Sequence, residues 1–259
     1  MEKYKIGLQE YSVREAFAEN PKDTLKKIAA MGYSGVELTM YNFNRDIQEY
    51  VDGLAEAGLE CYSCLTSLKY LDSENISATL EKVKALKANM VVIGAVDFAC
   101  LKEDSTYAEN IVKSMLRAME VMKQEGIAVG YHCHDGDFIN KIGEISFYEY
   151  VMEHTPQEFL MVLDTGNVQG GGGNPIELVR KYPGRTPTVH IKGYSQEKKY
   201  LTPVWESELD WDVFIPLVRD EGGAISFDIE FGQRGDYEPL ERAAQSAKWL
   251  KEMLEKYGK

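Results

Sequence analysis

The sequence predicts an α/β protein that folds as a (β/α)8 TIM barrel, and we expect a single domain that covers residues 1–259. Two observations lead to this fold class. Short apolar or β-branched runs alternate with amphipathic helical segments along the whole chain, which is typical of a parallel sheet with helical crossovers. Eight such units fit the chain at about 32 residues each, an ordinary size for a closed barrel.

The main alternative is a doubly wound open sheet. The turn after the first expected strand, residues 9–14, lacks the glycine pattern with which such sheets bind phosphate groups. Glycine instead recurs where a helical segment gives way to the next strand, because a helix commonly ends in a left-handed residue. These junction glycines are Gly32, Gly58, Gly126 and Gly222.

The eight expected strands are short runs of three to six residues, and each follows a helical segment or the chain start. They lie near residues 6–8, 36–38, 61–65, 90–93, 128–133, 160–163, 188–191 and 225–229. Cys61 and Cys64 form a lone C-x-x-C in the third strand, where we expect packing in preference to a zinc or redox site.

The expected helices each carry apolar residues three, four or seven positions apart, which marks one buried face. The first begins at Asn20 and Pro21, and shorter helices are expected near residues 147–152 and 175–182. The longer patterns rest on Leu25, Ile28 and Ala29; Ile47, Val51, Leu54 and Ala55; Ile76, Leu80, Val83 and Leu86; Ile111, Met115, Met119 and Met122; Phe214, Leu217 and Val218; and Leu240, Ala243, Ala247, Leu250 and Leu254.

The composition excludes several classes of partner. The formal net charge is -13 and no basic run interrupts it, so we expect no nucleic acid partner. No stretch approaches the roughly 20 apolar residues of a membrane span, so we expect no membrane partner. The first residues lead into a strand without a signal-peptide pattern, and we therefore expect a cytoplasmic protein.

Residues that bind metals are concentrated at the ends of the last four expected strands. Because catalytic groups of such barrels lie where strands end, these side chains are candidates for the active site. Neighbouring parallel strands lie about 4.8 Å apart, so their side chains can reach a common point. The candidates are His132 and His134, Asp164 and Asn167, His190 and Lys192, and Asp228 and Glu230. Two imidazoles with two carboxylates suit Mn²⁺, Co²⁺, Fe²⁺ or Zn²⁺ better than Mg²⁺ or Ca²⁺.

Several segments, in order along the chain, resemble the xylose isomerase-like TIM barrel superfamily of sugar phosphate isomerases and epimerases. The matching segments are residues 6–14, 32–38, 130–135, 163–168, 189–192 and 238–244. The resemblance implies metal ligands at Asp164 and His190, with Asp228 or Glu230 on the eighth strand. Many relatives have a ligand glutamate on the fifth strand followed two residues later by a histidine; here His132 and His134 occupy these positions.

The resemblance implies an enzyme that binds one divalent metal, Mn²⁺ first and Co²⁺, Fe²⁺ or Zn²⁺ otherwise, and a small carbohydrate substrate. We expect His132, Asp164, His190 and Asp228 as metal ligands. His134 or Glu230 would remove a proton next to a carbonyl, and Lys192 would stabilise the resulting enediolate. Substrate contacts are expected from Glu37, Asn167 and Arg234.

Three functions stay open at this point. The first is a metal-dependent isomerase or epimerase of a small sugar or sugar phosphate. The fifth-strand departure, His132 in place of glutamate, weakens a two-glutamate epimerase mechanism, so the second is a lyase or dehydratase acting on a keto-sugar, keto-glycoside or inosose. The third is a non-catalytic sugar-binding barrel or subunit, and homo-oligomers are compatible with all three. Endonuclease activity is disfavoured, because a trinuclear zinc cluster needs more than four histidines.

Overall fold

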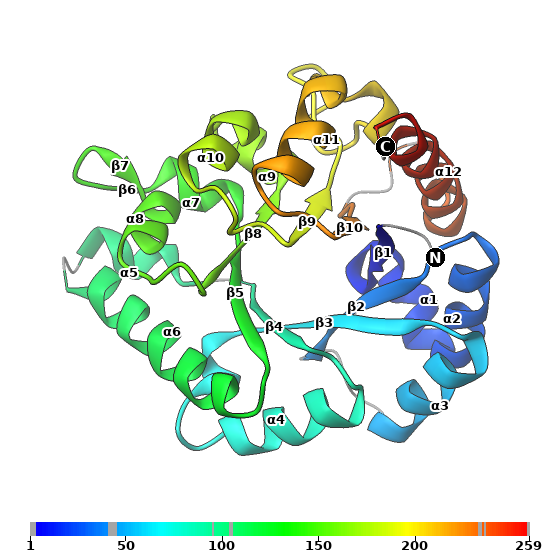
Figure 1. Cartoon of the computed structure of the whole chain (residues 1–259), viewed down its shortest axis with the longest axis horizontal. Helices are drawn as coiled ribbons and strands as arrows, with labels where there is room; N and C mark the ends of the chain where they lie inside the picture. The colour runs from blue at the N-terminus through cyan, green and yellow to red at the C-terminus, as the bar shows by residue number, and fades with distance from the viewer. Residues whose placement is uncertain are drawn as a thin grey trace.

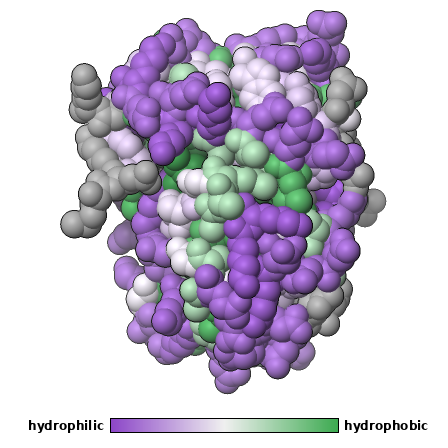
Figure 2. Space-filling view, turned by 90° about the vertical axis from the view of Figure 1, so that its right-hand side faces the viewer, coloured by the Kyte–Doolittle hydropathy of each residue, from purple (hydrophilic) through white to green (hydrophobic). Residues whose placement is uncertain are grey.

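Eight parallel strands close into a barrel that is surrounded by helices (Figure 1). The computed structural model describes residues 4–40, 46–94, 96–103, 106–232, 235 and 237–257. The fold class predicted from the sequence is therefore confirmed, and the open sheet is excluded. Figure 2 shows the side of the molecule that lies on the right in Figure 1, where hydrophilic residues surround a central band of hydrophobic ones.

The barrel strands follow one another around the ring in chain order, apart from the small hairpin inserted after β5. They are β1 (Lys5–Gln9), β2 (Gly35–Thr39), β3 (Glu60–Thr66), β4 (Met90–Ile93), β5 (Ala128–His132), β8 (Leu160–Asp164), β9 (Thr188–Ile191) and β10 (Ser226–Ile229). All eight expected strands are present, with ends within a few residues of those predicted. Strands β5, β8, β9 and β10 are consecutive neighbours, so their ends lie along one arc of the barrel mouth.

Helices follow the strands and cover the outside of the barrel. The principal helices are α2 (Pro21–Ala30), α3 (Ile47–Ala57), α4 (Ile76–Ala85), α6 (Tyr107–Gln124), α8 (Phe147–Glu153), α10 (Pro175–Lys181), α11 (Trp211–Asp220) and α12 (Pro239–Tyr257). Short elements that the sequence pattern did not predict are η1 (Glu10–Val13), α1 (Arg14–Glu19), η3 (Leu68–Leu71), α5 (Phe98–Glu103), α7 (Asp135–Ile139), β6 (Lys141–Ile142), β7 (Ile145–Ser146), α9 (Thr165–Gly170) and η4 (Val204–Glu206). Among the described residues, no helix is both long and apolar enough to cross a membrane.

Alternation along each strand separates the helix-facing core from the barrel interior. On β10, Phe227 and Ile229 belong to the main hydrophobic core, whereas Asp228 between them does not. Because neighbouring strand residues point to opposite faces, the polar residue faces inward. A separate small apolar cluster contains Leu65, Met90, Val92 and Val162. Buried polar residues such as Asp228 are therefore accompanied by a second apolar cluster that is distinct from the main core.

Three of the four junction glycines adopt the left-handed conformation that their position predicts. The φ angles are 94° at Gly32, 69° at Gly58 and 72° at Gly126. At the fourth junction the positive φ, 80°, belongs to Gly223 and not to Gly222. Cys61 and Cys64 are buried in β3 with sulfurs 3.9 Å apart and form no disulfide, as packing residues would.

Candidate metal centre

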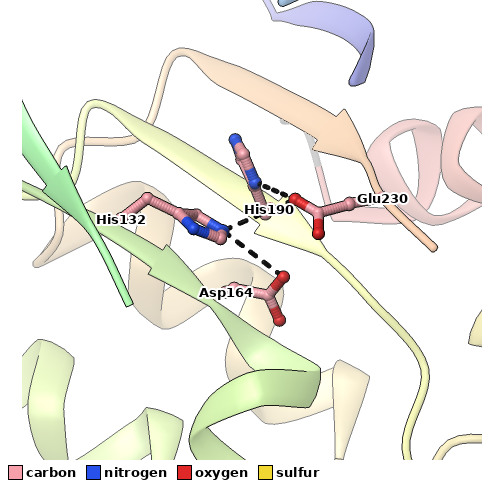
Figure 3. Close-up of side chains that lie close together, drawn as sticks. All are labelled: His132, Asp164, His190 and Glu230. Carbon is pink, nitrogen blue, oxygen red and sulfur yellow. Dashed lines mark hydrogen bonds and ion pairs between the residues drawn. The ribbon is translucent and has the colours of Figure 1, made fainter. Parts of the chain in front are cut away.

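Four side chains from neighbouring strands converge at the mouth of the barrel. His132, Asp164, His190 and Glu230 each offer one ligand atom, and these atoms all lie within 4.8 Å of one another. All four side chains are buried, and they point toward one another in Figure 3. We call these four residues the mouth cluster.

The register of the strands explains why the mouth cluster forms. Asp164 on β8 pairs with His190 on β9, so the two residues are direct neighbours across the two strands. His132 is the last residue of β5, and Glu230 directly follows β10. The His132 Nε2 lies 3.5 Å from Asp164 Oδ2 and 3.4 Å from Glu230 Oε2, and His190 Nδ1 lies 2.6 Å from Glu230 Oε2.

Several ligand atoms of the mouth cluster lack a hydrogen-bond partner among the described residues. They include the Nε2 of His132 and the Oδ2 of Asp164. Buried polar atoms are normally hydrogen-bonded, so a group of unpartnered donors and acceptors that face one another needs an explanation. A divalent cation satisfies such atoms, and two imidazoles with two carboxylates form a donor set that transition metals accept. The residues present therefore fit a single metal ion.

Lys192 supplies a buried positive charge beside the mouth cluster. Its Nζ donates to Glu230 Oε1 and to Asn167 Oδ1, both at 3.0 Å, and lies 3.4 Å from Asp164 Oδ2. Burial alone lowers the pKa of this ammonium, but the charges of Asp164 and Glu230 outweigh burial and raise it above its ordinary value. Lys192 is therefore charged at neutral pH. Asn167 in turn is held by Asp164, whose Oδ1 accepts from the Asn167 backbone N–H at 2.7 Å.

Ionic contacts also set the pKa values of Glu230 and His190. Burial favours the neutral form of Glu230, yet Lys192 and His132 lower the pKa of this carboxyl well below its usual range. Burial likewise lowers the pKa of His190, but Glu37 and Glu230 more than compensate and raise it well above 6.5. His190 lies between these two carboxylates, because its Nε2 is 3.3 Å from Glu37 Oε1.

His134 lies at the edge of the mouth cluster and is half-buried. Its ring centre is 4.9 Å from that of His132, and its Nδ1 has no hydrogen-bond partner among the described residues. Burial, followed by the charge of His132, lowers the pKa of His134 to about 4. The imidazole is therefore neutral at pH 7.

The structure moves the eighth-strand position of the candidate ligand set from Asp228 to Glu230. Asp228 lies one layer deeper, where its Oδ2 accepts hydrogen bonds from Thr188 Oγ1 at 2.6 Å and Ser226 Oγ at 3.1 Å. Burial raises the pKa of Asp228 to about 6. The physical reason is reach: two residues further along the strand, Glu230 has a longer side chain that extends to His132 and His190. Arg234, an expected substrate contact, lies outside the described residues.

Sequence reasoning missed two residues near the site. Ser63 on β3 donates a hydrogen bond to Glu37 Oε2 at 2.5 Å. Tyr200, in the loop after β9, donates to Asp135 Oδ2 at 3.1 Å, and its ring centre lies 5.5 Å from Lys192 Nζ. The sequence analysis selected ligand-type residues at the ends of the last four expected strands. Neither residue lies at such a position, so the sequence carried no signal for them.

Comparison with known proteins agrees with this architecture. The family model of the xylose isomerase-like TIM barrel matches residues 25–253. An inosose dehydratase of Bacillus cereus (strain AH820) is 25% identical over 244 residues, which cover 84% of this chain and 78% of that protein. A second inosose dehydratase, from Geobacillus kaustophilus, is 33% identical over 85 residues, but this match covers only 32% of this chain and 27% of that protein.

Solved structures share the fold at low sequence identity. A sugar phosphate isomerase/epimerase from Parabacteroides distasonis superposes with a TM-score of 0.78 at 19% identity and covers 95% of this chain and 97% of that one. A xylose isomerase-like TIM barrel protein from Mycobacterium smegmatis, solved in complex with magnesium, gives a TM-score of 0.70 at 15% identity, with 98% and 97% covered. The family match begins within α2 and ends within α12, so it spans most of the chain. The chain therefore belongs to the xylose isomerase-like TIM barrel family.

Proposed function

We propose that the mouth cluster binds one divalent cation and that this enzyme removes a proton from the carbon next to a carbonyl in a small sugar-like substrate. The observation that carries the proposal is the convergence of buried ligand atoms from four neighbouring strands, some of them without hydrogen-bond partners among the described residues. When bound, the cation would act as a Lewis acid on the carbonyl oxygen, which makes the adjacent C–H bond acidic.

We propose Mn²⁺ as the resident cation, with Co²⁺, Fe²⁺ or Zn²⁺ as alternatives. Imidazole nitrogens bind these ions well, whereas Mg²⁺ prefers oxygen ligands and retains its water. Two of the four residues of the mouth cluster are histidines. The M. smegmatis relative contains magnesium, so the chemistry of the donor set supports our choice and the comparison does not.

Lys192 is placed to stabilise negative charge on the substrate. The ammonium is buried and held by Glu230 and Asn167, so it needs little rearrangement when charge develops nearby. A fixed positive charge in a site that excludes water stabilises an anion far more than the same charge in bulk solvent. We therefore assign to Lys192 the stabilisation of the anion that forms when the C–H bond breaks.

His134 is our candidate for the base that takes the proton. Its Nδ1 has no hydrogen-bond partner among the described residues and its ring lies beside the mouth cluster. Glu230 is less suited to this role, because its carboxylate already contacts His132, His190 and Lys192. A site with one free base supports a reaction in which only one proton must be removed from carbon.

Loss of a β-leaving group such as water is the outcome that we favour. Epimerisation by two opposed glutamates needs a carboxylate at the end of the fifth strand, where this chain has His132. The inosose dehydratases among its relatives support elimination from an inosose or a related keto-sugar. Isomerisation or epimerisation is the second candidate, because the Lys192 ammonium beside the mouth cluster can also return a proton to the substrate.

Incubation with inososes and keto-sugars in deuterated water with added Mn²⁺ tests the proposal. Elimination gives a conjugated product that absorbs in the ultraviolet, whereas isomerisation gives deuterium at carbon without loss of water. We expect His132→Ala to abolish both Mn²⁺ binding and turnover. His154→Ala is the matched control, because His154 lies exposed at the end of α8 and should be replaceable without effect. Full activity in the presence of a strong chelator would refute metal-dependent chemistry.

A further inference from the structure

Glu37 is a completely buried carboxylate outside the mouth cluster, and one of its oxygens has no hydrogen-bond partner among the described residues. It lies on β2, and its Oε2 accepts the hydrogen bond from Ser63. The unpartnered Oε1 lies 3.3 Å from the Nε2 of His190, and this nitrogen also lacks a hydrogen bond. Two buried groups that each lack a partner therefore face one another.

A shift in strand register places Ser63 against Glu37. Along β2 and β3, Val36 pairs with Cys61, but the next residue, Glu37, pairs with Ser63. Tyr62 is thereby left out of the ladder, and its hydroxyl donates a hydrogen bond to Ser34 Oγ. Such an irregularity re-aims side chains locally, and here it brings a hydroxyl to the carboxylate that faces His190.

The orientation of the His190 ring distinguishes its two nitrogens. Nδ1 contacts Glu230 at 2.6 Å within the mouth cluster, while Figure 3 shows the other nitrogen pointing away from the other three side chains. A nitrogen that binds a cation cannot also carry a proton. If Nδ1 faces the cation, the single proton of the neutral ring is on Nε2, which faces Glu37.

We propose that Glu37 is a positioning residue, which accepts the Nε2–H of His190 and so fixes the tautomer and the orientation in which Nδ1 meets the cation. The inference rests on the proposed function, because it needs a cation in the mouth cluster. Outer carboxylates that accept a hydrogen bond from a metal-binding histidine typically strengthen metal binding about 10- to 100-fold. Complete burial argues against the direct substrate contact that the sequence suggested for Glu37.

Calorimetric titration of the chelator-treated full chain with Mn²⁺ measures the effect. We expect Glu37→Gln, which keeps a weaker acceptor, to reduce Mn²⁺ affinity about 10-fold and Glu37→Met, which removes the acceptor, about 100-fold. Glu10→Gln is the matched control, because Glu10 is equally buried but accepts from the Thr39 backbone N–H and not from His190. This control should bind Mn²⁺ as the wild type does.

A second measurement reports on the tautomer itself. Nitrogen-15 NMR of the Zn²⁺-loaded protein should show the His190 proton on Nε2 in the wild type and a changed Nε2 signal in Glu37→Gln, an effect that a purely structural role would not produce. If Glu37→Met does not fold, the Mn²⁺ affinity and the His190 spectrum of Glu37→Gln alone test the inference. Affinity of Glu37→Gln within about twofold of the wild type, with an unchanged His190 spectrum, would overturn this inference only. A wild type that binds no divalent cation would overturn the proposed function as well.

Discussion

Replacing Lys192 by methionine tests whether the mouth cluster depends on balanced charge. The side chain is buried, and its Nζ contacts Glu230, Asn167 and Asp164 at 3.0–3.4 Å. Methionine has a similar length and fills the same space, so packing should be nearly preserved. What changes is the charge: two buried carboxylates lose the ammonium that lies between them.

The size of the effect follows from the burial of these contacts. Removing one partner of a buried ion pair costs about 3–5 kcal/mol, because the remaining charge is left without compensation in a poorly solvated site. For a chain of this size each kcal/mol corresponds to about 2–4 °C in melting temperature. We therefore expect Lys192→Met to melt roughly 6–20 °C below the wild type when a chelator is present.

A cation in the mouth cluster should reduce this difference. Added Mn²⁺ supplies positive charge to the same carboxylates, and a ligand at about 1,000 times its dissociation constant stabilises the folded state by about 4 kcal/mol. The variant also no longer repels the ion with its own ammonium. The assay is differential scanning fluorimetry of both proteins with chelator and with Mn²⁺. Equal melting temperatures in chelator, or a difference that Mn²⁺ leaves unchanged, would refute the reasoning.

Three further predictions follow from the site and its surroundings. Glu230→Gln should weaken Mn²⁺ binding at least about 10-fold in calorimetry, whereas Asp228→Asn should leave it nearly unchanged; the reverse ranking would return the ligand role to Asp228. Treating the wild type with chelator should lower its melting temperature, and no change after verified metal removal would count against a resident cation. Burial raises the pKa of Glu10 to about 7 from 4.5, so from pH 4.5 to 7 the unfolded chain ionises while the folded chain stays protonated. The ionisation of Glu10 should therefore lower stability by about 3 kcal/mol as pH rises through this window, and the fall measured by urea unfolding between about pH 5 and about pH 8 should be smaller by roughly that amount in Glu10→Gln.

The repeated pattern of strand, helix and glycine was enough to predict the barrel. The left-handed conformation that ends a helix is set by the local sequence and needs no distant contact. It could therefore be predicted at Gly32, Gly58 and Gly126. Helix α9 could not be predicted in this way. Its sequence, Thr-Gly-Asn-Val-Gln-Gly, has poor helix propensity, and the helix starts because Asp164 accepts a hydrogen bond from the Asn167 N–H.

The candidate site was predictable only as far as the period of a strand allows. Alternation places Asp228 and Glu230 on the same inward face, so it cannot say which of them reaches His132 and His190. The register even pairs Asp228 with His190, and only the side-chain contacts of the folded barrel show that Glu230 is the residue that reaches both histidines. The partner of Glu37 was still less accessible, because one skipped residue in the pairing of β2 with β3 decides that Ser63 lies opposite it.

Buried carboxylates inside the barrel form two layers, a deeper one with Asp228 and an upper one with Glu230 and Glu37, and the two layers are stabilised in different ways. In the deeper layer the hydroxyls of Thr188 and Ser226 bind Asp228, and burial still raises its pKa to about 6, so this carboxyl can become neutral at modest cost. In the upper layer Glu230 and Glu37 have lowered pKa values, because Lys192 and the histidines outweigh burial. The upper carboxylates therefore stay charged and depend on neighbouring positive charge. A divalent cation adds to that positive charge and leaves the imidazoles neutral. We therefore expect cation binding to stabilise the folded protein through the upper carboxylates. Asp228 should not contribute to this coupling.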